Sequence, residues 1–138
     1  MPAVTTDQLA SGFIDLSLPT ENWTHYAHLR VGLWHAMRYP RAESLDLLRA
    51  RISAFNQAKG GENTASAGYH ETITRFYVHV IGHFLASTDP LRPRDELERE
   101  LIERYGDKEL PLQYYSRERL FSSEARLGWV APDLRALP

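Results

Sequence analysis

The sequence predicts an all-α protein, an antiparallel bundle of four to five helices with an irregular C-terminal tail packed on it. Apolar residues recur at intervals of three and four along several segments, as one face of an α-helix requires. No stretch alternates apolar and polar residues convincingly enough for a sheet. The 138 residues show no repeat and no linker, so we expect one domain over residues 1–138.

Helix-capping residues delimit the first two predicted helices. Thr6 or Asp7 can cap a short helix that runs through Asp15. Thr20 is a good N-cap for the second helix, which we expect over residues 21–38 because a proline follows soon after. The first turn of this second helix holds an acidic residue, which the positive helix terminus favours.

A small polar loop separates the next two predicted helices. The third helix should begin within residues 40–42 and extend to about residue 59, where two glycines end it. Thr64 or Ser66 can cap the fourth helix, which should run to about residue 86.

The C-terminal part of the chain predicts a charged helix followed by the tail. The helix should cover residues 95–105 and lie on the surface. The tail, residues 107–138, contains aromatic residues and arginines in pieces too short for long helices. We expect short helical turns at residues 112–121 and 123–127, and then an extended segment wrapped on the bundle.

Short connections predict the relative directions of the helices. Neighbouring helices joined by short loops pack antiparallel, so the second and fourth helices should run parallel, with their N-termini at one end of the bundle. Spacing places His25 and His28 on the inward face of the second helix and His70 on that of the fourth. We therefore expect these three side chains to meet, with Glu71 beside them. His35 lies about 15 Å farther along the axis and does not belong to the group.

Three imidazoles and a carboxylate at one end of a bundle suit a divalent metal ion. We expect Zn, Fe, Mn or Ni with an open position for water or substrate, and no organic cofactor. Glu71 could also act as a general base. It should turn inward to the histidines, because an exposed pair with Arg75 would contribute only ~0.3–0.5 kcal/mol. The predicted ligands are His25, His28, His70 and Glu71.

The predicted tail leaves the bundle at the same end as the histidines, where it could form a lid. Tyr114 and Arg117 are therefore expected to face the substrate. His79 and His83 form an i, i+4 pair that could chelate, but they lie on the outer face of the fourth helix. We favour a solvated or tail-contacting role for them.

Composition and charge exclude several classes of protein. There are no cysteines, which rules out disulfides and thiolate catalysis. Sixteen basic and eighteen acidic residues give a formal charge of -2 with no basic block, so nucleic acid is a poor candidate for a partner. No apolar stretch approaches the roughly 18 residues of a membrane span, and the N-terminus does not resemble a signal peptide. We expect a cytoplasmic protein that has no membrane partner.

Three motifs carry a resemblance to a known family. They are WTHYAHLRVGLW, GYHETITRFYVHVIGHFL and YYSRERLFSSEARLGWVAPDL. The chain from about residue 13 resembles a family of small, uncharacterised bacterial all-α proteins, which implies one complete unit and no established activity. The placement of histidines among long helices is also similar to the DinB-like bundles, although their usual histidine pair near the chain end is missing here.

Two functions follow from the predicted site. The first is a metal-dependent enzyme that acts on a small, anionic molecule, with Glu71, Tyr114 and Arg117 as catalytic or substrate-facing residues. The alternative is a non-catalytic small-molecule binding or protein-interaction module, in which the histidines only tie the helix ends together. The aromatic tail leaves a homodimer open under either function.

Overall fold

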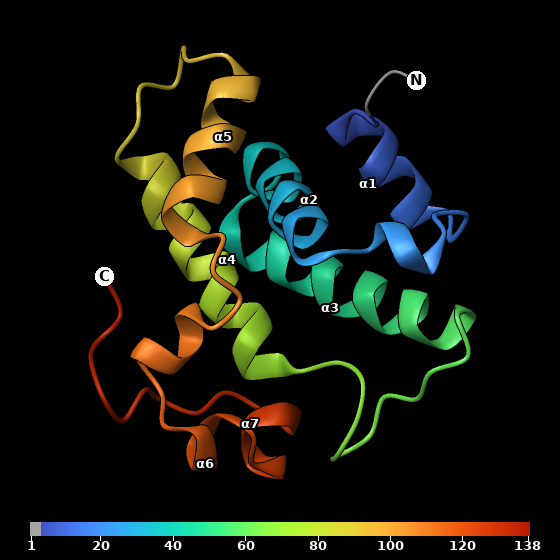
Figure 1. Ribbon diagram of the computed structural model, residues 1–138, viewed down its shortest axis with the longest axis vertical. Helices are drawn as coiled ribbons and strands as arrows, with labels where there is room; N and C mark the ends of the chain where they lie inside the picture. The colour runs from blue at the N-terminus through green and yellow to red at the C-terminus, as the bar shows by residue number, and fades with distance from the viewer. Residues whose placement is uncertain (1–3) are drawn as a thin grey trace.

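A computed structural model describes residues 4–138 (Figure 1). This part of the chain folds into seven α-helices and two short 3-10 helices and contains no strand. The predicted all-α fold is therefore confirmed. The elements are α1 (Thr6–Ile14), η1 (Thr20–Asn22), α2 (His25–Arg38), α3 (Arg41–Ala58), α4 (Glu71–Ala86), α5 (Arg94–Tyr105), η2 (Leu110–Gln113), α6 (Arg117–Leu120) and α7 (Ser123–Leu127).

The central helices α3 and α4 run antiparallel. Arg49, in the middle of α3, pairs with Glu71 at the start of α4. Arg41, at the start of α3, lies against Gly82 near the end of α4, where a Cβ atom would be only 2.5 Å from the guanidinium. The contacts therefore advance in opposite directions along the two helices.

Helices α2 and α4 run in the same direction but are offset along their axes. His25 at the start of α2 packs on Tyr77, with ring centroids 5.6 Å apart, and Gly32 farther along faces Ile81. These contacts advance in the same sense on both helices, as the sequence predicted. However, α4 has already run six residues from Glu71 when it meets His25, an axial offset of about 9 Å.

The second helix begins later than the sequence predicted. Residues 20–22 form the separate turn η1, and α2 starts at His25 with Thr24 as its N-cap. The Thr24 hydroxyl accepts a hydrogen bond from the Ala27 N–H at 3.2 Å. Trp23 stacks on Phe13 of α1, with ring centroids 4.4 Å apart, and this packing lies at the bend between η1 and α2. The prediction of one helix over residues 21–38, capped by Thr20, was wrong in its first turn.

The fourth helix also begins later than predicted, and one of the candidate histidines caps it. Neither Thr64 nor Ser66 is the cap, because the chain from residue 61 to residue 70 is irregular. His70 is the N-cap, and its Nδ1 accepts a hydrogen bond from the Ile73 N–H at 3.1 Å. An imidazole acceptor therefore takes the place of the hydroxyl that usually starts a helix.

Three clusters of buried apolar side chains stabilise the arrangement. One joins α1, α2 and α3, the second joins α2, α4 and α5, and the third joins α4 to the tail. Burial of a large apolar side chain contributes about 1.5–3 kcal/mol, so the tail is a packed part of the fold. The most buried members include Phe13 and Phe55 in the first cluster, Phe84 and Leu101 in the second, and Phe76 and Tyr115 in the third.

Helix α5 returns the chain to the start of α2, and the tail then covers the start of α4. Gly106, just after α5, lies against Tyr26 of α2. In Figure 1 the tail crosses beneath the N-terminal half of α4, and the Thr72 hydroxyl there donates a hydrogen bond to the Gly128 carbonyl at 2.8 Å. The predicted short turns are present as η2, α6 and α7. None of the helices within residues 4–138 is long and apolar enough to cross a membrane.

Candidate functional site

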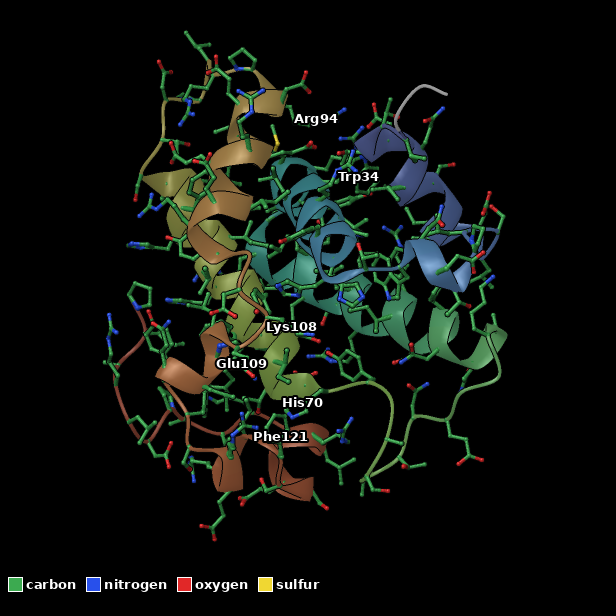
Figure 2. The ribbon with its side chains drawn as sticks, viewed as in Figure 1. Trp34, His70, Arg94, Lys108, Glu109 and Phe121 are labelled. Atoms are coloured by element: carbon green, nitrogen blue, oxygen red, sulfur yellow. The ribbon has the colours of Figure 1, made fainter. Side chains whose placement is uncertain are left out.

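A cavity of about 840 Å³ lies between α2, α3 and α4. The irregular segment before α4 and the tail from Lys108 to Phe121 complete its walls. The lining is mostly apolar and includes Leu29, Leu48 and Ile81. His70, Lys108 and Phe121, labelled in Figure 2, mark the side formed by the tail and the start of α4. The structure therefore provides a concave site of the size that small-molecule ligands occupy, roughly 300–1,000 Å³.

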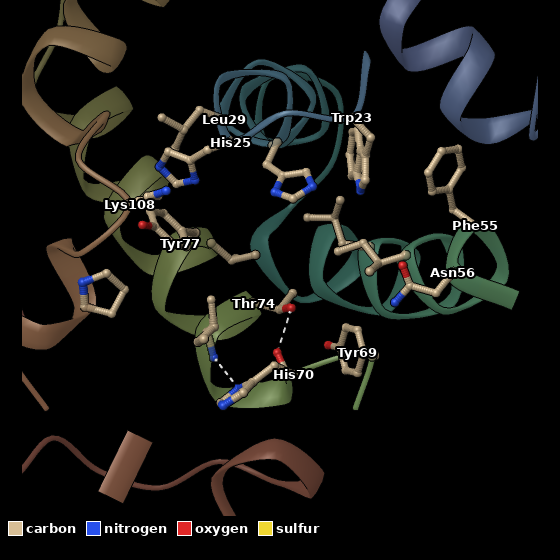
Figure 3. Close-up of a pocket in the computed structure, with 18 of the residues that line it drawn as sticks. Trp23, His25, Leu29, Phe55, Asn56, Tyr69, His70, Thr74, Tyr77 and Lys108 are labelled. Atoms are coloured by element: carbon tan, nitrogen blue, oxygen red, sulfur yellow. Dashed lines mark hydrogen bonds between the residues drawn. The ribbon is translucent and has the colours of Figure 1, made fainter. Parts of the chain in front are cut away.

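The three predicted histidines all line this cavity, but they do not converge on one point. His25 and His28 lie one turn apart on α2, whereas His70 lies at the start of α4 (Figure 3). Residues 4–138 hold no group of three or more His, Cys, Asp or Glu side chains that could bind one metal ion. The axial offset between α2 and α4 explains this separation, because it places His70 past the N-terminus of α2.

His70 is held by hydrogen bonds on both ring nitrogens. Its Nδ1 accepts from the Ile73 N–H, and its Nε2–H donates to the Leu120 carbonyl of the tail at 2.7 Å. The side chain is buried, and burial lowers its pKa, so the ring is neutral. His70 thus joins the start of α4 to α6, and neither nitrogen is free to bind a metal ion.

Glu71 does not turn toward the histidines as predicted. Both carboxylate oxygens accept from Arg49 of α3, at 2.8 Å and 2.7 Å, and one also accepts from the Tyr69 hydroxyl at 2.8 Å. These hydrogen bonds outweigh burial and hold the pKa of Glu71 below its usual value. The prediction of an inward carboxylate was therefore wrong. Arg49 neutralises the buried charge, and no turn toward the histidines is needed.

The two tail residues predicted to face a substrate have different positions. Arg117 lines the cavity, where its guanidinium lies 3.7 Å from the Glu109 carboxylate. Tyr114 is buried instead among the apolar residues between α4 and the tail, with its ring 5.4 Å from that of Phe76. It is not part of the cavity wall. The expectation that Tyr114 faces a substrate was wrong, because its aromatic ring is used in packing.

His28 presents its ring to the cavity. The side chain is exposed on the cavity side, although many protein atoms surround it and Trp23 packs edge-on with ring centroids 4.1 Å apart. This burial among protein atoms, with a smaller contribution from nearby His25, lowers the pKa of His28 to about 4. Neutral His28 can therefore accept or donate one hydrogen bond from each ring nitrogen at neutral pH.

His25 and Tyr77 form a second polar group on the wall. The Nε2 of His25 and the hydroxyl of Tyr77 are both buried, and neither has a hydrogen-bond partner within residues 4–138. Burial lowers the pKa of His25 and raises that of Tyr77, so both side chains are uncharged at neutral pH. Figure 3 shows Lys108 beside this pair. Native proteins rarely leave buried polar atoms unpaired, and such a group calls for an explanation.

The other histidines have structural positions. His35 is fully buried, donates from Nδ1 to the Val31 carbonyl at 2.8 Å and contacts Arg51 through Nε2 at 2.8 Å. His79 contacts the Pro138 carbonyl of the tail at 2.7 Å through Nε2, the tail-contacting role that we favoured for it. His83 is exposed at the end of α4.

Sequence reasoning missed two residues of this wall. Tyr77 lies on the inward stripe of α4, about two turns beyond His70, and this position was a usable signal. Lys108 follows α5 in an irregular segment, where no spacing rule indicates the direction of its side chain.

None of the protein-family models, curated proteins or solved structures compared with the chain matches it. The function therefore has to be inferred from the cavity and its side chains.

Proposed function

We propose that the protein binds a small, largely apolar organic molecule in the cavity between α2, α3 and α4. The observation that carries the proposal is a mostly apolar cavity of about 840 Å³ whose wall also includes a few polar side chains, His28 among them. Ligand sites usually combine apolar walls with a few polar groups that orient the ligand. This is the small-molecule binding module that the sequence left as its alternative.

The polar residues of the wall can orient such a ligand at two places. His28 offers a neutral imidazole. Arg117 and Lys108 lie toward the tail side of the wall and could contact an anionic group, which was the ligand charge predicted from the sequence. Because the apolar part of the wall is larger, we expect burial of apolar surface to supply most of the affinity.

A fluorescence titration with N-phenyl-1-naphthylamine, a neutral apolar dye, tests the proposal. Val78 lines the cavity and is only partly buried, so Val78→Phe should fill part of the space. We expect the native protein to bind the dye and Val78→Phe to bind it at least about tenfold more weakly, because the added ring takes the volume that the dye needs.

Val78→Ala is the matched control, because it enlarges the same space and should retain binding. Circular dichroism shows whether each variant keeps the helical fold. Equal dye affinity in the native protein and in folded Val78→Phe would contradict binding in this cavity.

The metal-dependent enzyme predicted from the sequence stays a prediction. The residues as placed do not fit a metal ion, because His70 uses both ring nitrogens and Glu71 is held by Arg49. Only His25 and His28 lie close together on the wall, which is fewer than the three protein ligands of a typical catalytic site. The predicted cytoplasmic location, bacterial origin and homodimer also stay predictions.

A further inference from the structure

A second hollow, of about 500 Å³, lies between α3, α4 and α7 and is lined mainly by polar residues. Among residues 4–138, Tyr69 alone lines both this hollow and the apolar cavity. Three arginines and one carboxylate on its wall give a formal charge of +2; they are Arg49, Arg75, Arg126 and Glu71. We propose that this hollow binds the phosphate group of a small organic phosphate monoester, a site that does not rest on the binding function proposed above.

Arg49 and Glu71 neutralise each other within the hollow. Both carboxylate oxygens of Glu71 accept from the Arg49 guanidinium. Asp46 also contacts Arg49, at 3.0 Å, but it lies outside the hollow and its side chain is 74% exposed, so solvent screens its charge. The charge that remains without a partner on the wall is therefore that of Arg75 and Arg126.

Arg75 is held in place by an uncharged group. Its guanidinium lies over the ring of Trp129, with the central carbon 4.9 Å from the ring centroid. Within the described part of the chain, no carboxylate is in ion-pair contact with Arg75, because Glu71 is taken by Arg49. Stacking on an aromatic face fixes the plane of a guanidinium and leaves its in-plane N–H groups free to donate. Arg75 thus keeps both its charge and its donors.

Arg126 is also anchored without being neutralised. It donates one hydrogen bond to the Gly68 carbonyl at 2.7 Å, and a carbonyl carries no charge to cancel its own. Figure 1 shows α7, which carries Arg126, beneath the start of α4. The hydrogen bond from the Thr72 hydroxyl to the Gly128 carbonyl ties these two segments together. The fold therefore places two fixed, uncompensated guanidinium groups on one wall before any ligand arrives.

A phosphate group suits this wall better than a carboxylate. The planar fork of arginine matches phosphate oxygens, and charge-assisted hydrogen bonds of this kind are strong. A phosphate monoester carries about -1.5 to -2 charge at neutral pH, close to the formal charge of the wall, whereas a carboxylate carries half as much. Ser53 of α3 adds a hydroxyl that can donate to a further oxygen. The hollow is within the roughly 300–1,000 Å³ of small-molecule sites, so an organic part also has room.

Isothermal titration calorimetry with phenyl phosphate, inorganic phosphate and benzoate tests the inference. At neutral pH we expect phenyl phosphate to bind the native protein about tenfold more tightly than benzoate, because it presents a second charge and a third oxygen. We also expect phenyl phosphate to bind more tightly than inorganic phosphate, because its ring can cover exposed apolar surface such as that of Leu127.

Arg75→Gln and Arg126→Gln should each bind phenyl phosphate at least about tenfold more weakly, because each loses a charged donor. Arg99→Gln is the matched control, since it removes the same charge from an exposed position on α5, outside the hollow. It should leave the affinity unchanged. Circular dichroism shows whether each variant keeps the helical fold.

Ser53→Asp tests the site while both arginines stay in place. The added carboxylate should repel the phosphate and occupy the guanidinium donors, so we expect no measurable binding of phenyl phosphate. Ala54→Asp is its control, because Ala54 is the next residue of α3 and is exposed outside the hollow. This variant should bind the probe as the native protein does.

Several outcomes would overturn the inference. One is equal affinity for phenyl phosphate in the native protein and in folded Arg75→Gln and Arg126→Gln. Another is an equal loss in Arg99→Gln, which would show an effect of net charge alone. Benzoate or inorganic phosphate binding as tightly as phenyl phosphate would overturn the assignment to a phosphate monoester.

The Val78→Phe variant separates this site from the apolar cavity. It should weaken binding of the apolar dye and leave phenyl phosphate affinity unchanged, because Val78 does not line the hollow. A parallel loss of phenyl phosphate binding in Val78→Phe would place this probe in the cavity and overturn the inference. If the dye fails to bind while phenyl phosphate binds as expected, the proposed function falls and the phosphate site stands.

Discussion

Removal of the Tyr77 hydroxyl should stabilise the protein in the absence of ligand. The hydroxyl is buried and has no partner within residues 4–138, so the folded state loses the hydrogen bonds to water that the unfolded chain retains. An unpaired buried polar group costs about 1–3 kcal/mol. Phenylalanine keeps the ring that packs on His25 and Phe76, so Tyr77→Phe removes the cost and little else.

Tyr115→Phe provides a comparison with the opposite sign. The Tyr115 hydroxyl is also buried, but it donates to the Val130 carbonyl at 2.8 Å. Its removal should lower the free energy of unfolding by about 1–2 kcal/mol, because one hydrogen bond is lost and the carbonyl is left unpaired. We expect Tyr77→Phe to raise the free energy of unfolding by about 1 kcal/mol. This value is the low end of the range for the cost of an unpaired buried group.

Urea unfolding followed by circular dichroism measures both changes, and thermal unfolding checks them. In a domain of this length, 1 kcal/mol corresponds to a shift in Tm of about 3 °C. If Tyr77→Phe destabilises the protein as much as Tyr115→Phe does, the Tyr77 hydroxyl is already paired in solution. The conclusion that this hydroxyl is buried without a partner would then be refuted.

Three further predictions address the other ionisable residues. Glu71→Gln should destabilise the fold by about 2 kcal/mol, a value reduced because the Arg49 side chain is partly exposed and solvent screens its charge. The same variant should leave the dye affinity unchanged in the fluorescence titration. The pKa of His35 is lowered from 6.5 to about 4, so the unfolded chain takes up the proton first as the pH falls. His35 alone should therefore lower the stability by about 2 kcal/mol from pH 7 to pH 5 in urea titrations, in addition to the loss from His28, whose pKa is also about 4. An NMR titration showing His35 with a pKa near 6.5 would contradict this. If the predicted metal site forms, a chelator should lower the Tm of protein purified without a His-tag, and an unchanged Tm would count against it.

The helices and their directions could be predicted because they depend on local patterns and short connections. The bounds of α3 and α5 agree with the sequence within about two residues, the usual uncertainty of helix ends. The antiparallel order followed from the short loops, and it correctly brought His25, His28 and His70 to one cavity. Periodicity thus predicted which wall these residues share.

The axial offset between α2 and α4 could not be predicted, because it depends on which residue caps each helix. Thr20 and Thr24 are equally suitable caps from the sequence, and the packing of Trp23 on Phe13 accompanies the later start. A histidine as the cap of α4 follows no common rule. These local choices decide whether three histidines meet at one point or lie along one wall.

The positions of Glu71 and Tyr114 depended on contacts between distant parts of the chain. The sequence shows Arg75 one turn from Glu71, but the carboxylate is bound by Arg49, which lies 22 residues earlier on α3. Tyr114 packs on Phe76 within the cluster that fixes the tail to α4. Spacing along one helix gives no information on such partners.

A crystal structure with 6-bromo-2-naphthol tests the central claim most directly, because the bromine can be located by its anomalous scattering. The account predicts a bromine atom inside the cavity, among the walls formed by α2, α3 and α4. Bromine found only on the outer surface, with the cavity empty at saturating ligand, would contradict the claim that this cavity is the binding site.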